Sequence, residues 1–477
     1  MDVIEYKYKK EDIKSGILHF GVGNFHRAHQ AFYTNQLLNL GNHNHWGICG
    51  VSLMASDKKV TNALEAQNLD YTLSTFSSDG TEEVFSIGAI NELISGLENP
   101  KAVIDKIADP DIKIISMTIT EGGYNLDKIT NEFNFDDKKI SNDLVKENEP
   151  TTIFGFVARG LEKRKNNSNG GLTILSCDNL QHNGNVAEKS FMSFMKAYDE
   201  DLANWAETNV SFPNSMVDRI TPGTSEADKE RLNSKSGVND GAPVYSEKFI
   251  QWVIEDNFIA GRPSWEEVGV QFTDDVSAYE NMKLSLLNAS HTLLSYPSFV
   301  KGYRAVDKAM NDADILDFVK LFMDVDVTPY VPSPEGIDLD SYKQTLVDRF
   351  SNSAVSDQLA RLCYDGISKF PVYIIPNAKK MLQDGKDMTR IAFLVAVYRH
   401  YLKYKEDDKG VAYTVEEPWM TDDDKKLIAS NVEEDFLTLS PFKSIDFKSS
   451  ESFVKLYKDF VEKIQENGVE EVLKSII

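Results

Sequence analysis

The feature that most restricts the fold is a pair of glycines between a buried strand and a helix near the N terminus. Residues 16–20 form an apolar run that predicts a strand, and Gly21-Val22-Gly23 follows it directly. Residues 25–40 have the apolar spacing of a helix, and residues 46–53 predict a second strand. A glycine turn at this place can hold a pyrophosphate through backbone N–H groups and the helix dipole. The sequence therefore predicts a β-α-β unit of the dinucleotide-binding type.

The rest of the chain changes from mixed to helical patterns. In the first half, buried strands are expected at residues 112–120 and 172–176, and a hairpin at residues 71–76 and 83–87. Later segments follow the helical period: 315–323, 342–350, 357–363, 388–404 and 453–466. A chain of 477 residues exceeds what one hydrophobic core normally organises. We therefore expect an α/β protein with a Rossmann-type N-terminal domain in residues 1–282 and a largely α-helical C-terminal domain in residues 283–477.

Charge and composition restrict the partners and the location. The chain has 51 basic and 75 acidic residues and a net charge of −24, which opposes binding to nucleic acid or to an anionic membrane. The N-terminal segment lacks the apolar run of a secretory signal, and the longest apolar stretch near the C-terminal half, residues 391–398, cannot span a bilayer. We therefore expect a cytoplasmic protein without a nucleic-acid or membrane partner.

Metal binding is not expected. The three cysteines are widely separated, and the chain has neither a Cys-x-x-Cys pair nor a typical zinc spacing. His43 and His45 lie two residues apart in a turn, where histidines are usually solvated. We therefore expect chemistry without a metal ion.

The glycine turn and the helix start supply the candidate cofactor contacts, which are Gly21, Gly23, Asn24, Phe25 and Arg27. His26 replaces the third glycine of the usual G-x-G-x-x-G pattern, and Ala28 can supply the small residue for helix-strand packing. Arg27 either reaches a phosphate or the nicotinamide amide, or it is a solvated arginine of the first turn.

Asp57 is the acidic candidate after the second strand. There it can bind the adenosine ribose, or it can act as the N-cap of a helix that begins at Lys58. A carboxylate at this place repels a 2′-phosphate and favours NAD, whereas Lys58 and Lys59 can accommodate NADP. We expect NAD as the cofactor and leave NADP open.

Residues 283–291 carry the candidate catalytic groups. Lys283, Asn288 and His291 lie in an otherwise apolar helical segment. Around the axis of an α-helix, Asn288 would lie about 140° and His291 about 80° from Lys283. A desolvated lysine beside an amide and an imidazole can take a proton from an alcohol while the developing oxygen charge is held. The alternative is a surface lysine, an exposed asparagine and a buried histidine without catalytic function.

Two more polar clusters end strand-like runs. Asp178 and Asn179 follow the strand predicted at 172–176, and Asp218 lies in a second such segment. Strand ends of an open α/β sheet face its ligand cleft, although capping of the loop explains Asp178 and Asn179 equally well.

Taken together, several motifs resemble the polyol-specific long-chain dehydrogenases, and most closely their mannitol 2-dehydrogenase branch. The resemblance spans from about residue 17 to at least Pro371. It is carried by the segments 18–33, 118–124 (TITEGGY), 176–180 (SCDNL), 216–222 (MVDRITP), 283–291, 327–329 (VTP), 336–343 and 361–371.

The resemblance implies metal-free, NAD(P)-dependent interconversion of D-mannitol and D-fructose, on small polyol and ketose substrates. It implies that Lys283 is the general acid and base, that Asn179 and Asn288 bind the reactive oxygen, and that His291 helps to hold it. It also favours a monomer over an oligomer.

Four further roles follow from the resemblance alone. Asp218, Arg361 and Lys369 would contact substrate hydroxyls, and Glu280 would lie on the proton path from Lys283 to solvent. Tyr364 stands where the family varies, which leaves the preference among mannitol, arabitol and sorbitol open.

Three alternatives remain. The same fold can reduce a hexuronate such as fructuronate or tagaturonate, whose carboxylate would need Arg361 or Lys369 as a fixed cation. Mannitol 1-phosphate fits less well, because no further basic cluster stands out to hold a phosphate. A dinucleotide sensor without turnover would not need the lysine, asparagine and histidine set.

Overall fold

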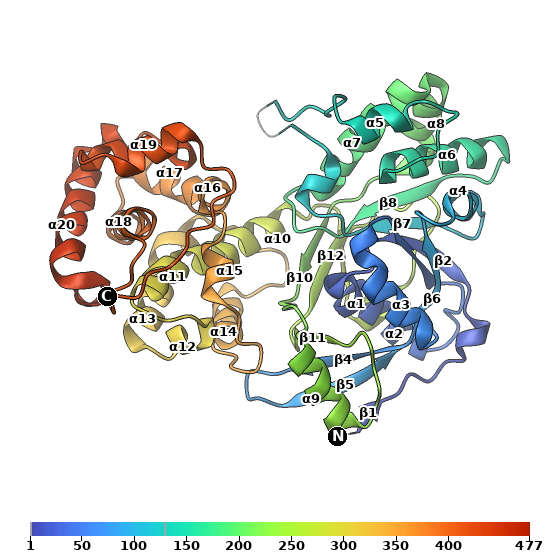
Figure 1. The fold of residues 1–477 in the computed structure, drawn as a ribbon, viewed down its shortest axis with the longest axis horizontal. Helices are drawn as coiled ribbons and strands as arrows, with labels where there is room; N and C mark the ends of the chain where they lie inside the picture. The colour runs from blue at the N-terminus through green and yellow to red at the C-terminus, as the bar shows by residue number, and fades with distance from the viewer. Residues whose placement is uncertain (1, 128–129) are drawn as a thin grey trace. The chain divides into compact units, whose positions relative to one another are not determined.

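The computed structural model describes residues 2–127 and 130–477, and the chain divides into two compact units (Figure 1). The N-terminal unit comprises Met1–Ser77 and Thr81–Ser277, and the C-terminal unit comprises Ser78–Gly80 and Ala278–Ile477. Among the described residues, the N-terminal unit contains two hydrophobic core clusters and the C-terminal unit contains one.

The N-terminal unit is built on a six-stranded parallel sheet with the order β6-β3-β2-β7-β8-β9. Its strands are β2 (Ser15–Phe20), β3 (Gly47–Ser52), β6 (Ile90–Ser95), β7 (Ile114–Met117), β8 (Leu172–Ser176) and β9 (Val210–Ser211). Counted in chain order within the sheet, this is the 3-2-1-4-5-6 order of a Rossmann fold, and the order reverses between β2 and β7. Ligands bind at such a reversal, beyond the carboxyl ends of the strands.

Both faces of this sheet are covered, which explains why its strands are continuous apolar runs. Successive strand residues point to opposite faces. On β2, Leu18 and Phe20 pack in one core with helices α4 and α6, while Ile17 packs in a second core with α2. The helices of the unit are α1 (Asn24–Ala28), α2 (Gln30–Asn39), α3 (Lys58–Ala66), α4 (Pro100–Ala108), α5 (Lys138–Asp143), α6 (Ile153–Asn166), α7 (Asn183–Tyr198), α8 (Glu200–Asn209) and α9 (Glu226–Ser236).

Two smaller sheets complete the N-terminal unit. One has the order β1-β5-β4-β11 and contains the expected hairpin, with β4 (Tyr71–Phe76) antiparallel to β5 (Glu82–Ile87). The other has the order β10-β12-β13. The remaining strands are β1 (Val3–Ile4), β10 (Ser215–Asp218), β11 (Val244–Glu247), β12 (Gln251–Glu255) and β13 (Gln271–Thr273).

Two expected elements of the N-terminal unit differ from the structure. The single helix expected at 25–40 is broken at His29, whose backbone leaves the helical region while its ring Nε2 bonds the Gln251 carbonyl at 3.0 Å. The strand expected at 112–120 ends at Met117. The Asp178 carboxylate accepts the N–H groups of Ile119 and Thr120, which are thereby taken out of the sheet.

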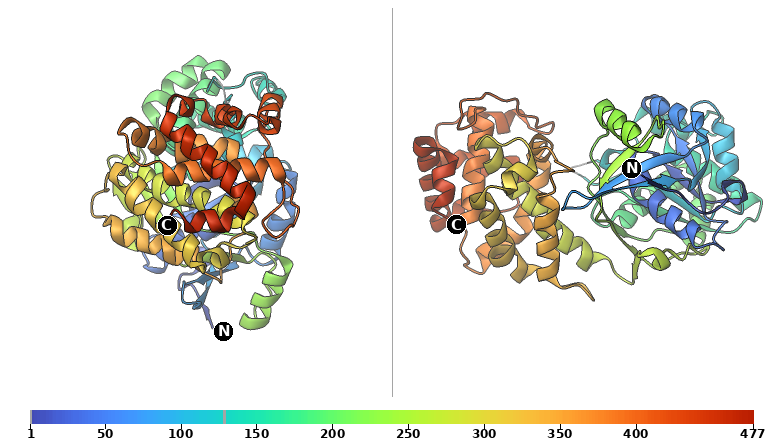
Figure 2. Two further views of the ribbon diagram at one scale, coloured as in Figure 1. Left: turned by 90° about the vertical axis from the view of Figure 1, so that its left-hand side faces the viewer. Right: turned by 90° about the horizontal axis from the view of Figure 1, so that it is seen from below.

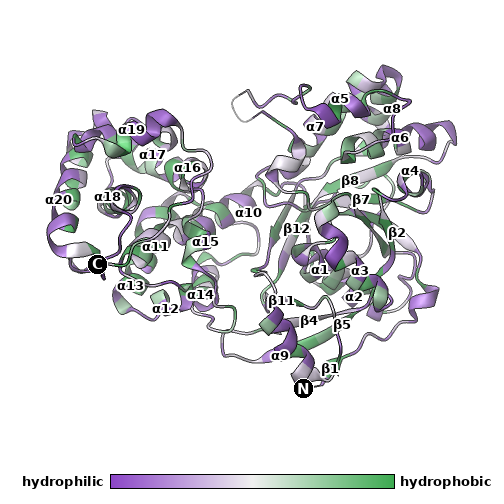
Figure 3. Cartoon of the chain, viewed as in Figure 1, coloured by the Kyte–Doolittle hydropathy of each residue, from purple (hydrophilic) through white to green (hydrophobic). Residues whose placement is uncertain are grey.

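The regular elements among the described residues of the C-terminal unit are helices joined by loops, as Figure 2 shows from two further directions. Its longer α-helices are α11 (Ala289–Val300), α13 (Ala313–Leu321), α14 (Leu339–Phe350), α17 (Ile375–Gln383), α18 (Thr389–Tyr404), α19 (Asp422–Ala429) and α20 (Glu451–Lys474). The short ones are α10 (Ser277–Met282), α12 (Val306–Met310), α15 (Leu359–Cys363) and α16 (Gly366–Lys369). Helix α18 is buried along most of its length and packs against α11, α19 and α20. In Figure 3 helix α20 shows both hydrophilic and hydrophobic segments. None of the described helices combines the length and the low polarity needed to cross a membrane.

Candidate active site

The glycine turn has the geometry that a dinucleotide site requires. Gly21 has a φ of +96°, and a Cβ at this position would lie 2.3 Å from the Thr118 carbonyl oxygen. No other residue type fits there without strain. Gly23 begins α1, is exposed, and has nothing within 4 Å of where its Cβ would stand. The second glycine of such a turn gives a pyrophosphate its close approach to the backbone, so the space at Gly23 fits a dinucleotide.

A buried network of hydrogen-bonded polar side chains contacts this turn, and the sequence pattern did not predict it. His19 stacks on His26 with ring centroids 3.4 Å apart, and its Nδ1 lies 2.8 Å from the Ser116 hydroxyl. Ser116 donates in turn to Gln30, and the other His19 nitrogen lies 3.1 Å from the Gly21 carbonyl oxygen. Burial lowers the pKa of His19 to about 3, so the ring is neutral near pH 7.

Arg27 does not extend into solvent, so the alternative of a solvated first-turn arginine is wrong. The side chain is 1% exposed, stacks on Tyr71, and donates to the Ala242 carbonyl and to the Asn24 side chain. These contacts hold the guanidinium inside the N-terminal unit, which favours a structural role over a phosphate contact.

Asp57 stands at the N-cap position of α3, but its side chain does not cap that helix. Its carboxylate instead accepts the backbone N–H of Met54 at 3.3 Å and is partly exposed. Lys58 and Lys59 form ion pairs of 2.8 Å with Glu98 and Glu226.

Asn183 joins the end of strand β8, from which the loop with Asn179 begins, to strand β10, which ends at Asp218. The Asn183 amide donates to the Ser176 and Asp178 carbonyls after β8 and to the Ser215 carbonyl of β10. Asn179 is exposed at the end of β8, and Asp218 is buried at the end of β10. The neighbouring Asp178 caps the loop, which was the alternative to a ligand contact. Its carboxylate accepts hydrogen bonds from two backbone N–H groups and from the Tyr124 hydroxyl.

Residues Lys283–Asn288 form a π-helix, η5, and not the α-helix assumed from the sequence. The Ala289 N–H donates to the Leu284 carbonyl, five residues back. Because a π-helix bonds residues five apart, it brings residues 283 and 288 to neighbouring positions around its axis, whereas an α-helix would separate them by about 140°. The local fold therefore places the amine and the amide on one face.

Lys283 and Asn288 are also buried, at 6% and 8% exposure, so the alternative of a surface lysine and an exposed asparagine is wrong. The apolar neighbours Leu286 and Leu287 belong to the core of the C-terminal unit. Glu280 is buried three residues before Lys283, in the preceding α10.

The structure brings three more of the expected residues to the same part of the C-terminal unit. The π-helix η5 packs against residues Phe370–Ile374, which directly follow Lys369. The Lys369 amine donates to the Leu362 carbonyl at 3.0 Å. Burial, followed by the nearby charge of Arg361, lowers the pKa of Lys369. His291 is half-buried and packs on the ring of Phe350.

Asp357 is a charged residue of this group that sequence reasoning missed. It forms a two-bond ion pair with Arg361. Burial raises the pKa of Asp357, but Arg361 and the adjacent His291 lower it more, and the net shift is downward. The spacing of four residues between Asp357 and Arg361 on a helical turn is the signal that could have revealed the pair.

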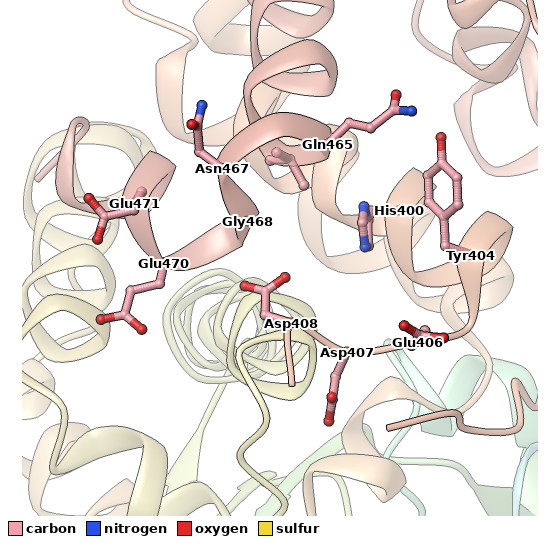
Figure 4. Close-up of a pocket in the computed structure, with 11 residues that line it drawn as sticks. His400, Tyr404, Glu406, Asp407, Asp408, Gln465, Asn467, Gly468, Glu470 and Glu471 are labelled. Carbon is pink, nitrogen blue, oxygen red and sulfur yellow. The ribbon is translucent and has the colours of Figure 1, made fainter. Parts of the chain in front are cut away.

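A separate cavity of about 680 Å³ lies in the C-terminal unit between the end of α18 and the kink of α20 (Figure 4). Acidic side chains dominate its lining, among them Asp408, whose carboxylate accepts the Val469 N–H at the kink. None of the expected site residues lines it. Within residues 2–127 and 130–477, no group of three histidine, cysteine or acidic side chains is arranged to hold a metal ion.

Comparison with known proteins adds independent information. The profile of the mannitol dehydrogenase Rossmann domain matches residues 15–267, and that of the mannitol dehydrogenase C-terminal domain matches residues 275–465. A polyol:NADP oxidoreductase of Gluconobacter oxydans is 41% identical over 91% of this chain and 90% of its own.

Two solved structures are similar over nearly their whole length. The Pseudomonas fluorescens mannitol 2-dehydrogenase, in ternary complex with NAD and D-mannitol, has 42% identity and a TM-score of 0.88, covering 100% of this chain and 96% of its own. A D-sorbitol dehydrogenase in substrate-free form has 39% identity and a TM-score of 0.93, covering 99% and 97%. The chain therefore belongs to the mannitol dehydrogenase family.

Proposed function

We propose that the protein is an NAD(P)-dependent polyol dehydrogenase that interconverts D-mannitol and D-fructose. In this proposal residues 1–282 form the domain that holds the dinucleotide, and residues 283–477 form the domain that supplies the proton-transferring group. The observation that carries it is the π-helix η5, in which Lys283 and Asn288 are both buried and lie five residues apart, the spacing of its hydrogen bonds. The relative whose title names both NAD and D-mannitol supports the substrate pair.

The chemistry follows from the residue types. When bound, the nicotinamide accepts hydride from the alcohol carbon or returns it to the ketone. Lys283 takes the hydroxyl proton during oxidation and gives it back during reduction, which near neutral pH requires a lysine removed from bulk water. The amides of Asn288 and Asn179 donate to the oxygen as it gains alkoxide character, and His291 helps to hold it.

The remaining residues bind the sugar or carry the proton away. We assign Asp218, Arg361 and Lys369 to the substrate hydroxyls. Glu280 is buried one helical turn before Lys283 and serves as the next proton acceptor on the path to solvent.

The N-terminal unit supports NAD as the preferred cofactor. Gly21 and Gly23 shape the turn for the pyrophosphate, Asn24 and Phe25 lie partly exposed beside it, and Asp57 binds the adenosine ribose. The ion pairs of Lys58 and Lys59 with glutamates reduce the positive charge that a 2′-phosphate would need. The similarity to a polyol:NADP oxidoreductase keeps NADP as a second cofactor.

Oxidation of NADH, followed by its absorbance, tests the proposal directly. We expect oxidation with fructose, and slower or no oxidation with fructuronate. NADH binding without oxidation by either sugar would instead support a dinucleotide sensor. A faster reaction with fructuronate would support a hexuronate reductase.

A further inference from the structure

Asp357 and Arg361 form an ion pair in which the carboxylate is mostly buried and the guanidinium is exposed to solvent. The Asp357 side chain is 9% exposed, and that of Arg361 is 60% exposed. The Arg361 Nε donates to one carboxylate oxygen at 2.8 Å, and an Nη donates to the other. Such two-point pairing fixes the plane of the guanidinium and leaves its remaining N–H groups for other acceptors.

The backbone around Asp357 holds this carboxylate in place. The Asp357 carbonyl accepts the Val306 N–H, and the carboxylate accepts the N–H of Gln358 at 2.8 Å. The preceding Ser356 has a φ of +42°, and its hydroxyl donates to Asp307. Because its backbone and carboxylate are held by these hydrogen bonds, Asp357 is a lasting partner of Arg361 and differs from the acid of a mobile surface ion pair.

The charges around this pair decide what Arg361 can bind. Its neighbours are the cation Lys369, which donates to the Arg361 and Leu362 carbonyls, and the ring of His291 beside Asp357. Without Asp357 the two cations would form a strong site for a carboxylate. With Asp357 the guanidinium charge is already compensated, while its outer N–H groups still suit neutral hydroxyls.

We propose that Asp357 is a specificity-determining residue that selects uncharged polyols and ketoses over sugar acids by compensating the charge of Arg361. This inference rests on the proposed function, in which Arg361 faces the substrate. It adds a reason for discrimination against a hexuronate, because the carboxylate of the substrate would compete with the carboxylate of Asp357 for the Arg361 guanidinium.

The test compares kcat/KM for fructuronate and for fructose in Asp357→Asn. This change keeps the side-chain shape and removes the charge. We expect the ratio of fructuronate to fructose to rise by roughly tenfold, the size of one charge-assisted contact. A merely structural role would lower both rates without raising this ratio, and an unchanged ratio would overturn the proposal.

Two further variants complete the test. Arg361→Gln removes the cation and leaves the Asp357 carboxylate, so it should move the same ratio below the wild-type value, and a rise would overturn the proposal even if Asp357→Asn does not fold. The matched control is Asp256→Asn, which breaks a similar two-bond pair with Arg262 in the N-terminal unit, at 2.7 and 3.0 Å, and should leave the ratio unchanged. Absence of fructose reduction by the wild-type protein would instead contradict the proposed function itself.

Discussion

Asn288 follows Lys283 by five residues in a π-helix, so the two buried side chains lie on one face of it. Under the proposed function, this arrangement lets the Asn288 amide donate to the oxygen from which the Lys283 amine takes a proton. Such π-helical turns are rare and often mark functional sites.

Asn288→Ala should therefore lower kcat and leave KM nearly unchanged, because the amide acts on a charge that develops only in the transition state. Loss of one such donor typically costs about 10²- to 10³-fold in kcat. Steady-state kinetics with fructose and NADH measure the change in kcat and in KM. The matched control is Asn281→Ala, in the adjoining α10, whose side chain accepts the hydroxyl of Ser285 in η5. A similar loss in both variants would indicate that the helix, and not the amide, had been damaged.

The two glycines of the phosphate turn should respond differently to alanine. Gly21→Ala places a Cβ 2.3 Å from a carbonyl oxygen at a φ of +96°, and we expect it to lower the melting temperature. Gly23→Ala meets no protein atom, so its melting temperature should be that of the wild type while its affinity for NADH falls. Calorimetry and NADH fluorescence separate the two effects. Unchanged NADH affinity in Gly23→Ala would argue against a pyrophosphate at this turn.

Asp57→Ala should relax the preference for NAD over NADP. The carboxylate does not cap α3 and accepts only the long 3.3 Å bond from the Met54 N–H among the described backbone donors, so its removal should change the cofactor ratio with little loss of stability. The measurement is kcat/KM for both reduced cofactors with fructose. An unchanged ratio together with a lower melting temperature would favour a purely local structural role.

Much of the N-terminal unit could be predicted because its signals are local. A buried strand, two glycines and an amphipathic helix lie next to one another in the sequence, and the structure confirms the Rossmann-type fold. The break at His29 could not be predicted, because it depends on the Gln251 carbonyl and on packing against Trp252, which lie far along the chain.

The candidate site shows the same division. The residue types of Lys283 and Asn288 marked the segment, but the π-helix that aligns them leaves little trace in apolar spacing. The sequence pattern places Asp357 only at the start of the helical segment 357–363. Its pairing with Arg361 becomes informative only when His291 and Lys369 are known to lie beside it.

Glu417 should make stability depend on pH. Its carboxylate accepts the Gly366 and Ile367 N–H groups at the start of α16, and burial raises its pKa to about 7. The folded state therefore holds a proton that the unfolded state releases above about pH 4.5. The contribution of Glu417 to the free energy of unfolding is therefore fully present below about pH 4.5 and is lost as the pH rises to about 7.

Melting temperatures from pH 4.5 to 8 measure this effect. Glu417→Gln cannot titrate, so its stability relative to the wild type should rise across that interval and stay level above it. The adjacent Glu416→Gln serves as the control and should not show this trend. A constant difference between Glu417→Gln and the wild type would contradict the shifted pKa.

The most direct test of the proton-transfer role is Lys283→Ala, assayed for fructose reduction and for NADH binding in the same preparation. We predict that turnover falls by orders of magnitude while NADH affinity stays close to the wild-type value, because the change removes proton transfer and leaves the nucleotide turn intact. Loss of NADH binding in parallel with turnover, or turnover close to that of the wild type, would contradict the assignment of Lys283 as the acid and base.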